Sequence, residues 1–277
     1  MGWLGHLDLR FRLDDHGRCL LHDRHEGPLR VLRALHPEGP GVCHGVVVHP
    51  PGGIVGGDAL ALEATLAPGA HALLTTPGAT RFYRSAGAPA LQSVELHVAE
   101  GARAEWLPLE TICHAGALAE SRLRAHLAPG AEAMGWDVLA LGLPASGAPF
   151  DRGCFRQHIE LPGAWLERGA LDAADTRLLD SPLGLAGRRV LATMWFGAGA
   201  ALADARREAL LDAAREAVAG TPLARWAGVT APGPRVVVLR ALGERVEPAM
   251  ALLVQVWQRW RRVAWTREAC APRVWRT

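Results

Sequence analysis

Lysine is absent from this chain of 277 residues, so all 30 of its basic residues are arginine. A nucleotide-binding P-loop needs a lysine that reaches the phosphates of the nucleotide. An enzyme that works through a Schiff base needs a lysine amine as its nucleophile. The sequence therefore excludes both of these classes of protein.

Cysteine is scarce, and its pattern suits neither a disulfide framework nor structural zinc. The five cysteines are an odd number, and no two of them have C-x-x-C spacing. Disulfide-stapled domains carry even sets of cysteines, and zinc ribbons carry paired C-x-x-C motifs. A reducing compartment is the simplest setting for such a chain, so we expect a cytoplasmic location.

Long apolar runs are missing as well. No run reaches the roughly 18 residues that a transmembrane helix needs. The first stretch, "MGWLGHLDLRFRLDD", carries charges where a secretory signal needs an apolar segment. One tyrosine and five phenylalanines offer few rings on which bases could stack. We expect no membrane span, no signal peptide and no nucleic-acid partner.

Four related segments recur along the middle of the chain. They are "LAPGA" at 66–70, "VAEGA" at 98–102, "LAPGA" at 127–131 and "LPGA" at 161–164, and their final alanines follow one another at intervals of 32, 29 and 33 residues. A period near 30 residues indicates a recurring supersecondary unit. Apolar and polar residues alternate before each segment, which is typical of half-buried strands.

Pro-Gly pairs in three of these segments predict type II turns, because proline fixes φ at one position and glycine supplies a positive φ at the next. Tight hairpins prefer other turn types, so we expect looser hairpins or corners where the chain passes between sheets. The sequence predicts a mainly β fold: a β-helix-like stack of short strands in packed sheets, with repeats over about 40–200, in one domain that spans 1–277.

Helical patterns occur only near the end of the chain, over 202–218 and 247–263. The second predicted helix has an apolar stripe of Met250, Leu253, Val254, Trp257 and Trp260. Its last turn carries Arg259, Arg261 and Arg262, where the helix dipole favours cations. We expect the stripe to pack on the β body and these arginines to point outward. From 225 to 277 there are ten arginines and three glutamates, which suits a solvated face or an acidic partner.

The stretch "VCHGVVVHPPGGIVGGD" contains the densest group of candidate metal ligands. If 46–48 is a strand, Cys43 and His49 share one of its faces and His44 takes the other. A compact tetrahedral site is therefore geometrically poor, although one or two of these side chains could serve as weak ligands. Asp58 either caps the turn formed by the glycine pairs or presents a carboxylate to a cation. No motif places a nucleophile beside a base.

Five stretches resemble one known family. "CHGVVVHPPGGIVGGD", "TTPGATRFYRS", "WLPLETICHAGA", "WDVLALGLPASG" and "PRVWRT" occur in the order and spacing of the urease accessory protein UreD family, called UreH in some organisms. The resemblance runs from about residue 27 to the end of the chain. Leu109 stands where the family would have Gln. Leu143 and Ala148 stand where we would expect an Arg and a Glu, which puts in doubt any role for that loop.

The resemblance implies a maturation factor without catalytic activity of its own. Such a protein binds the urease apoprotein and, with UreF and the GTPase UreG, promotes nickel insertion into the urease active site. Another metallochaperone supplies the nickel, which is in transit, so we expect no tightly bound cofactor. The family fold is a β-helix-like stack with two helices, in agreement with the repeats.

The resemblance also implies a nickel path lined by Asp58, Thr75, Thr76, Asp137 and Glu167. Turn capping or surface polarity is the ordinary alternative for each of these residues. Transient ligands on the same path are Cys43, His44 and His49. For Arg259, Arg261 and Arg262 we expect contact with the UreF–UreG assembly.

Two other functions stay open at this point. One is a metal-dependent hydrolase that uses His44, His49 and Asp58. The other is a plain β scaffold that only docks partners and never touches nickel.

Overall fold

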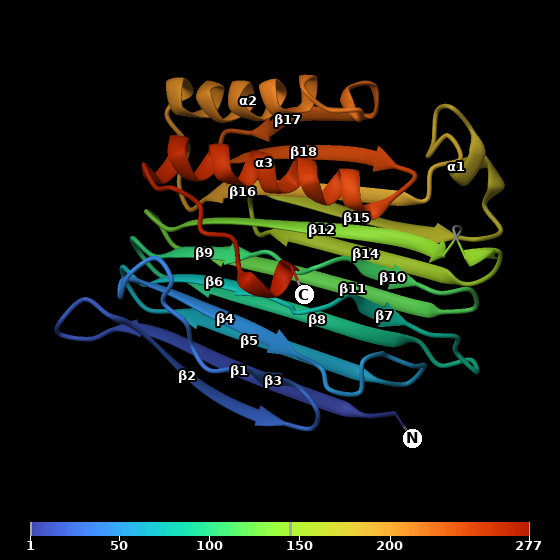
Figure 1. Cartoon of the computed structure of the whole chain (residues 1–277), viewed down its shortest axis with the longest axis horizontal. Coiled ribbons are helices and arrows are strands. Elements are labelled where there is room, and N and C mark those ends of the chain that lie inside the picture. The colour runs from blue at the N-terminus through green and yellow to red at the C-terminus, as the bar shows by residue number, and fades with distance from the viewer. Residues whose placement is uncertain (1, 144–145, 277) are drawn as a thin grey trace.

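The computed structural model describes residues 2–143 and 146–276. Two β-sheets face each other, and two long helices cover the outer face of one of them (Figure 1). Strands account for 46% of the structure and helices for 18%. The predicted mainly β fold is confirmed, whereas the extent of the single domain stays a prediction.

The first sheet has the strand order β15-β14-β11-β8-β5-β1-β2 within the described residues. Its strands are β1 (Leu4–Leu13), β2 (Cys19–Glu26), β5 (Ala59–Leu66), β8 (Ala90–Val98), β11 (Leu118–Leu127), β14 (Cys154–Leu161) and β15 (Trp165–Asp172). On the outer face of this sheet, Arg122 and Arg124 of β11 are exposed.

The second sheet has the order β17-β18-β16-β12-β9-β6-β4-β3, with β7, β10 and β13 beside one end of β12. Its strands are β3 (Arg30–Val31), β4 (Val42–Val48), β6 (His71–Thr75), β7 (Thr80–Phe82), β9 (Arg103–Trp106), β10 (Thr111–Cys113), β12 (Glu132–Leu143), β13 (Ala148–Pro149), β16 (Val190–Ala198), β17 (Ala227–Gly233) and β18 (Val236–Gly243).

The repeated turns are the corners of a coil. The first three carry the chain from the first sheet to the second, from β5 to β6, from β8 to β9 and from β11 to β12. Gly69, Gly101 and Gly130 adopt φ angles of 72°, 67° and 78° there, which glycine tolerates best. The fourth turn instead closes the antiparallel hairpin of β14 and β15. Because β5, β8, β11 and β14 run parallel, the predicted β-helix-like stack is confirmed.

Alternation along the strands separates two apolar cores. In β5, Leu60 and Leu62 point between the sheets and are buried. In β12, Leu139 also belongs to this inter-sheet core, whereas Trp136 and Val138 on the opposite face pack under the helices. The second sheet is therefore buried on both faces, which explains its nearly continuous apolar runs.

The predicted helices are confirmed as α2 (Asp204–Ala219) and α3 (Val246–Trp265). A short helix α1 (Thr176–Asp180) precedes both predicted helices, so the expectation of helices only near the end of the chain is wrong. At five residues α1 is too short to show a periodic pattern, although Asp175 caps it by accepting a hydrogen bond from the Leu178 amide. Single 3₁₀ turns occur at Ala224–Trp226 and Arg273–Arg276.

The apolar stripe of α3 packs on the β body as predicted, but the buried face is wider than the stripe. Leu253, Trp257 and Trp260 of the predicted stripe are fully buried. Leu252 and Val256, which were not part of the predicted stripe, are fully buried as well. The wider burial follows from the position of α3, which contacts α2 as well as β12, β16 and β18. None of the helices in the described part of the chain has the length and apolar character needed to span a bilayer.

The prediction that three arginines of α3 point outward is wrong for one of them. Arg262 is exposed and Arg259 is half-buried, but Arg261 is completely buried. Arg261 lies four residues after Trp257 and thus on the same helix face, which turns inward.

Candidate functional site

A row of polar side chains crosses the inward face of the first sheet. Gln92 in β8, Ser121 in β11 and Gln157 in β14 are direct neighbours in the parallel register. They occupy the alternation positions that point between the sheets, where Val94 and Leu123 are buried apolar neighbours. We call these three residues the polar row. The interior of the coil is therefore not uniformly apolar.

The second sheet and β15 place carboxylates at one end of the polar row. Asp137 in β12 is paired with Thr193 in β16, which in turn is paired with Arg240 in β18. Glu167 reaches this row from β15, where it accepts hydrogen bonds from Arg240 Nε at 2.8 Å and from Thr193 Oγ1 at 3.4 Å. Two residues predicted to line the nickel path, far apart in sequence, thus lie together.

Asp137 has the most unusual environment of these groups. Its Oδ1 atom is buried and has no hydrogen-bond partner among the described residues. Burial raises the pKa of this carboxyl to about 6, the charge of Glu167 adds to the rise, and a hydrogen bond with Gln157 opposes it. At neutral pH the site thus holds a carboxylate with a free oxygen, which can accept a cation or a proton.

A cavity of about 320 Å³ lies between the sheets near the other end of the polar row. Its walls are mostly apolar, and they include Trp106 and the side chain of Gln92. His49 and Thr76, from the two proline–glycine loops, also line it. Burial lowers the pKa of His49, and the charge of Asp58 opposes this shift. A neutral imidazole is the form that binds a metal ion.

Asp58 serves as a cap for the turn that precedes β5. Its Oδ1 atom accepts a hydrogen bond from the Trp3 amide at 2.8 Å, and its Oδ2 atom accepts one from the Val55 amide at 3.0 Å. The side chain is almost completely buried. This geometry fits the capping interpretation, and a role of Asp58 in the nickel path stays a prediction.

We expect Asp58→Ala to lower the free energy of unfolding by about 1–2 kcal/mol, since it leaves two partly buried amides without their acceptors. Asp58→Asn keeps one acceptor and should lose less. Urea unfolding of the two variants measures the difference, with the exposed Asp15→Ala as a control. If both variants unfold like the wild type while urease receives less nickel, the carboxylate acts on the cation and the cap is dispensable.

The remaining predicted residues lie away from this interior or are closed off within it. Cys43 is buried beside Cys19, whose thiol hydrogen bond raises the pKa of Cys43. Thr75 is on the helix-facing side of β6, donating to the Leu107 carbonyl at 2.6 Å and accepting from Trp275 at 2.8 Å. Neither residue is placed to contact an ion that moves through the cavity.

His44 and His49 lie on opposite faces of the β4 end, as the alternation predicted. His49 lines the cavity, whereas His44 is buried on the helix-facing side of the second sheet. No group of three or more His, Cys, Asp or Glu side chains within 2–143 and 146–276 is arranged to hold a metal ion. The geometry therefore gives no support to a hydrolase built on His44, His49 and Asp58.

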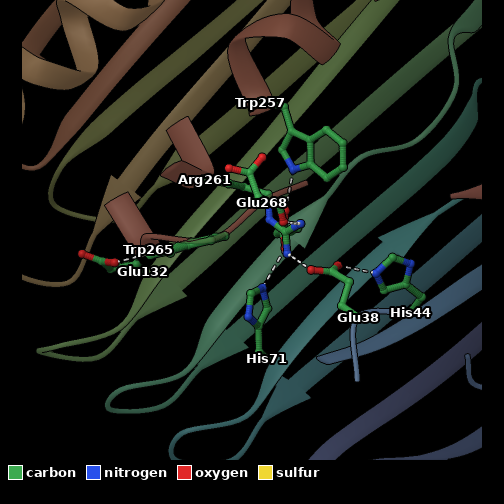
Figure 2. A network of polar contacts seen from close by, with 9 residues as sticks. Glu38, His44, His71, Glu132, Trp257, Arg261, Trp265 and Glu268 are labelled. Atoms are coloured by element: carbon green, nitrogen blue, oxygen red, sulfur yellow. Dashed lines mark hydrogen bonds and ion pairs between the residues drawn. The ribbon is translucent and has the colours of Figure 1, made fainter. Parts of the chain in front are cut away.

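A buried ionic network joins α3 to the second sheet (Figure 2). Arg261 Nη2 lies 2.7 Å from Glu38 Oε2 and 3.4 Å from Glu105 Oε1. His44 Nε2 contacts Glu38 at 2.7 Å, and His71 Nε2 contacts Glu105 at the same distance. Burial tends to raise the pKa of Glu38, but the hydrogen bonds with His44 and Arg261 outweigh it and lower the pKa. The network holds α3 against the sheet and contains none of the cavity-lining groups.

Leu143 and Ala148 are partners across β12 and β13. The Arg and Glu that we expected at these two positions would therefore face each other, so the two departures remove one cross-strand pair together. The loop between them includes residues outside the described ranges.

The fold and the interior define a coiled β protein in which polar side chains cross the space between two sheets. A family model described as "UreD urease accessory protein" matches residues 4–276. The chain belongs to the UreD urease accessory protein family. It is 58% identical to the urease accessory protein UreD of Leptothrix cholodnii and 59% identical to that of Methylibium petroleiphilum, each over the full length of both chains. A third relative, from Albidiferax ferrireducens, is 57% identical over 99% of each chain.

Proposed function

We propose that this chain is a urease maturation factor through which nickel passes on its way to the urease active site. It binds the urease apoprotein and acts with UreF and the GTPase UreG, which provides the GTP hydrolysis that this lysine-free chain cannot. Membership of the UreD family supports the role in urease maturation. The observation that carries the nickel path is the buried, unpartnered carboxylate oxygen of Asp137 beside Glu167.

The proposed path begins at the cavity, follows the polar row and reaches the carboxylates. His49 and Thr76 offer nitrogen and oxygen at the cavity, the polar row offers amide and hydroxyl oxygens, and Asp137 offers a charge. Imidazole suits Ni²⁺, and carboxylates bind it more weakly. A path must bind its ion weakly at several points so that the ion can leave. The absence of a compact set of ligands in the described interior fits passage better than storage.

Exchange of Asp137 and Glu167 for their amides tests this path. In cells that make the urease apoprotein with its accessory proteins at limiting nickel, Asp137→Asn with Glu167→Gln should lower the nickel content of purified urease. We expect the nickel content of urease to fall roughly tenfold. A loss of about 1.4 kcal/mol in the binding free energy of nickel at one step of the path changes the binding constant by this factor. Elemental analysis measures the nickel, and co-purification measures the complexes.

Asp15→Asn, at an exposed turn, is the matched control for the loss of a carboxylate. Normal nickel content with intact complexes in the double variant would leave only the docking of partners as the function of this chain.

A further inference from the structure

The coil has an arginine-rich edge beside the cavity, at the end where β7 and β10 lie (Figure 1). Arg81 lines the cavity, and Arg84 follows it on the same exposed segment. Neither forms an ion pair within the described residues, and Arg152 meets only its neighbour Asp151 at 3.7 Å. We call Arg81, Arg84 and Arg152 the arginine rim.

Aromatic and apolar side chains lie beside the arginine rim. The side chains of Arg84 and Arg152 both lie against Gly116, where the space for a Cβ atom is already taken by Arg84. Tyr83 stacks on His114 with ring centroids 4.8 Å apart, and its other neighbour is Gly53 of the loop after β4. Tyr83 is 37% exposed, and Val55 in the same loop region is 46% exposed. Arginine and tyrosine beside exposed apolar side chains are typical of binding surfaces.

The three arginines of α3 that the sequence favoured as partner contacts differ from Arg81 and Arg84 in charge pairing. Arg259 pairs with Glu216 at 2.8 Å, Arg262 pairs with Glu268 at 2.7 Å, and Arg261 is buried in the network. Carboxylates of the chain itself already satisfy these arginines. The unpaired positive charge that lies beside the cavity belongs to the rim.

We propose that the arginine rim docks an acidic segment of a protein partner in urease maturation. This inference rests on the proposed function and names the surface at which the path meets that partner. Guanidinium groups bind carboxylates through paired hydrogen bonds. Unpaired guanidinium groups beside the cavity also repel a divalent cation, and a partner's carboxylates would neutralise them. Nickel entry would then depend on docking.

A protein fits the rim better than a nucleic acid does. One face of Tyr83, the one tyrosine of the chain, is already stacked on His114, so at most its other face is left for a base. Burial, together with the charge of Arg81, lowers the pKa of His114, so this imidazole adds no charge near neutral pH.

The test uses the full chain with Arg81→Glu and Arg84→Glu and measures its affinity for the urease apoprotein and for UreF with UreG. We expect at least about tenfold weaker binding of the partner that carries the acidic segment, because like charges then face each other. The wild-type affinity for that partner should fall as salt is raised, and the variant should lose most of this dependence. Arg81→Gln with Arg84→Gln should give an intermediate loss.

Arg12→Glu is the matched control, since Arg12 is exposed and lies near the opposite end of the first sheet, next to the β1–β2 turn. Circular dichroism confirms that each variant is folded. The inference would be overturned if the Arg81→Glu, Arg84→Glu variant bound both partners with affinities within twofold of the wild type. It would also be overturned if the wild type bound duplex DNA as tightly as it binds its protein partners. Failure of the proposed nickel path would be visible separately, as normal nickel delivery by the Asp137 and Glu167 variant.

Discussion

Arg261→Met should lower the free energy of unfolding by about 3–5 kcal/mol, the largest loss that we expect from a single substitution in this chain. The guanidinium of Arg261 is the cation that lies between Glu38 and Glu105, and all three side chains are buried. Methionine fills similar space but leaves two carboxylates buried without a cation: Glu38 keeps only His44, and Glu105 keeps His71 and the Trp257 indole N–H. Urea unfolding followed by circular dichroism measures the loss.

Arg262→Met is the matched control. Arg262 directly follows Arg261 in the same helix, but its side chain is 59% exposed and pairs only with the exposed Glu268. Surface ion pairs contribute less than about 1 kcal/mol. Adding Glu38→Gln to Arg261→Met should recover part of the loss, since it removes one of the uncompensated charges. Equal stability of the two methionine variants would contradict the assignment of the network as the attachment of α3.

The stability given by Glu38 has a defined pH dependence. Its pKa is lower in the folded state than the ordinary value of 4.5. The contribution of Glu38 to the free energy of unfolding is therefore fully present at pH values above its pKa in the unfolded state. It is lost as the pH falls through its pKa in the folded state. In Arg261→Met, where one cause of the lowered pKa is gone, this acid-dependent part of the unfolding free energy should shrink.

Asp137→Asn should have the opposite effect and stabilise the protein at pH 7.5. The pKa of Asp137 is raised from 3.8 to about 6, so the folded state resists ionisation. Stability is then lost as the pH rises from the unfolded pKa to the folded one, and the full cost is present above about pH 6. The difference between the two pKa values corresponds to about 3 kcal/mol, which is the upper limit of the expected gain.

Thermal unfolding at pH 7.5 and at pH 5 checks this prediction. The gain from Asp137→Asn should be smaller at pH 5, where roughly half of the cost of ionisation applies. The exposed Asp15→Asn should change little at either pH. A gain that does not depend on pH would contradict ionisation of Asp137 as its cause. A more stable protein that delivers less nickel would show that this residue is kept for function at the expense of stability.

Local patterns in the sequence were enough to predict the coil. The Pro-Gly pairs fix positive φ at Gly69 and Gly130, and alternation sets which strand residues face inward. The same alternation placed His44 and His49 on opposite faces. These features depend on neighbours within a few residues, so no knowledge of distant contacts was needed.

The site could be predicted only in part, because its contacts join distant segments. Asp137 and Glu167 were singled out by resemblance, but only the packing of one sheet on the other brings β12 and β15 together. The polar row had a detectable signal: Gln92, Ser121 and Gln157 interrupt inward-facing apolar positions. The burial of Arg261 had one local signal, its position four residues after Trp257. Its partner Glu38 could not be predicted, because Glu38 is far away in the chain and lies outside the regular strands.

The corners of the coil also determine how the chain can change its length during evolution. In β8, Val94 and Leu96 point inward, whereas Glu95 between them is on the opposite face. Deleting one residue ahead of Glu95 would shift this alternation and turn the glutamate toward the apolar interior. Insertion of a whole circuit, from one glycine corner to the next, would keep every inward position and extend both sheets by one strand. We therefore expect selection to remove insertions and deletions within the strands. Insertions and deletions in the exposed loops, or of complete circuits, should be tolerated.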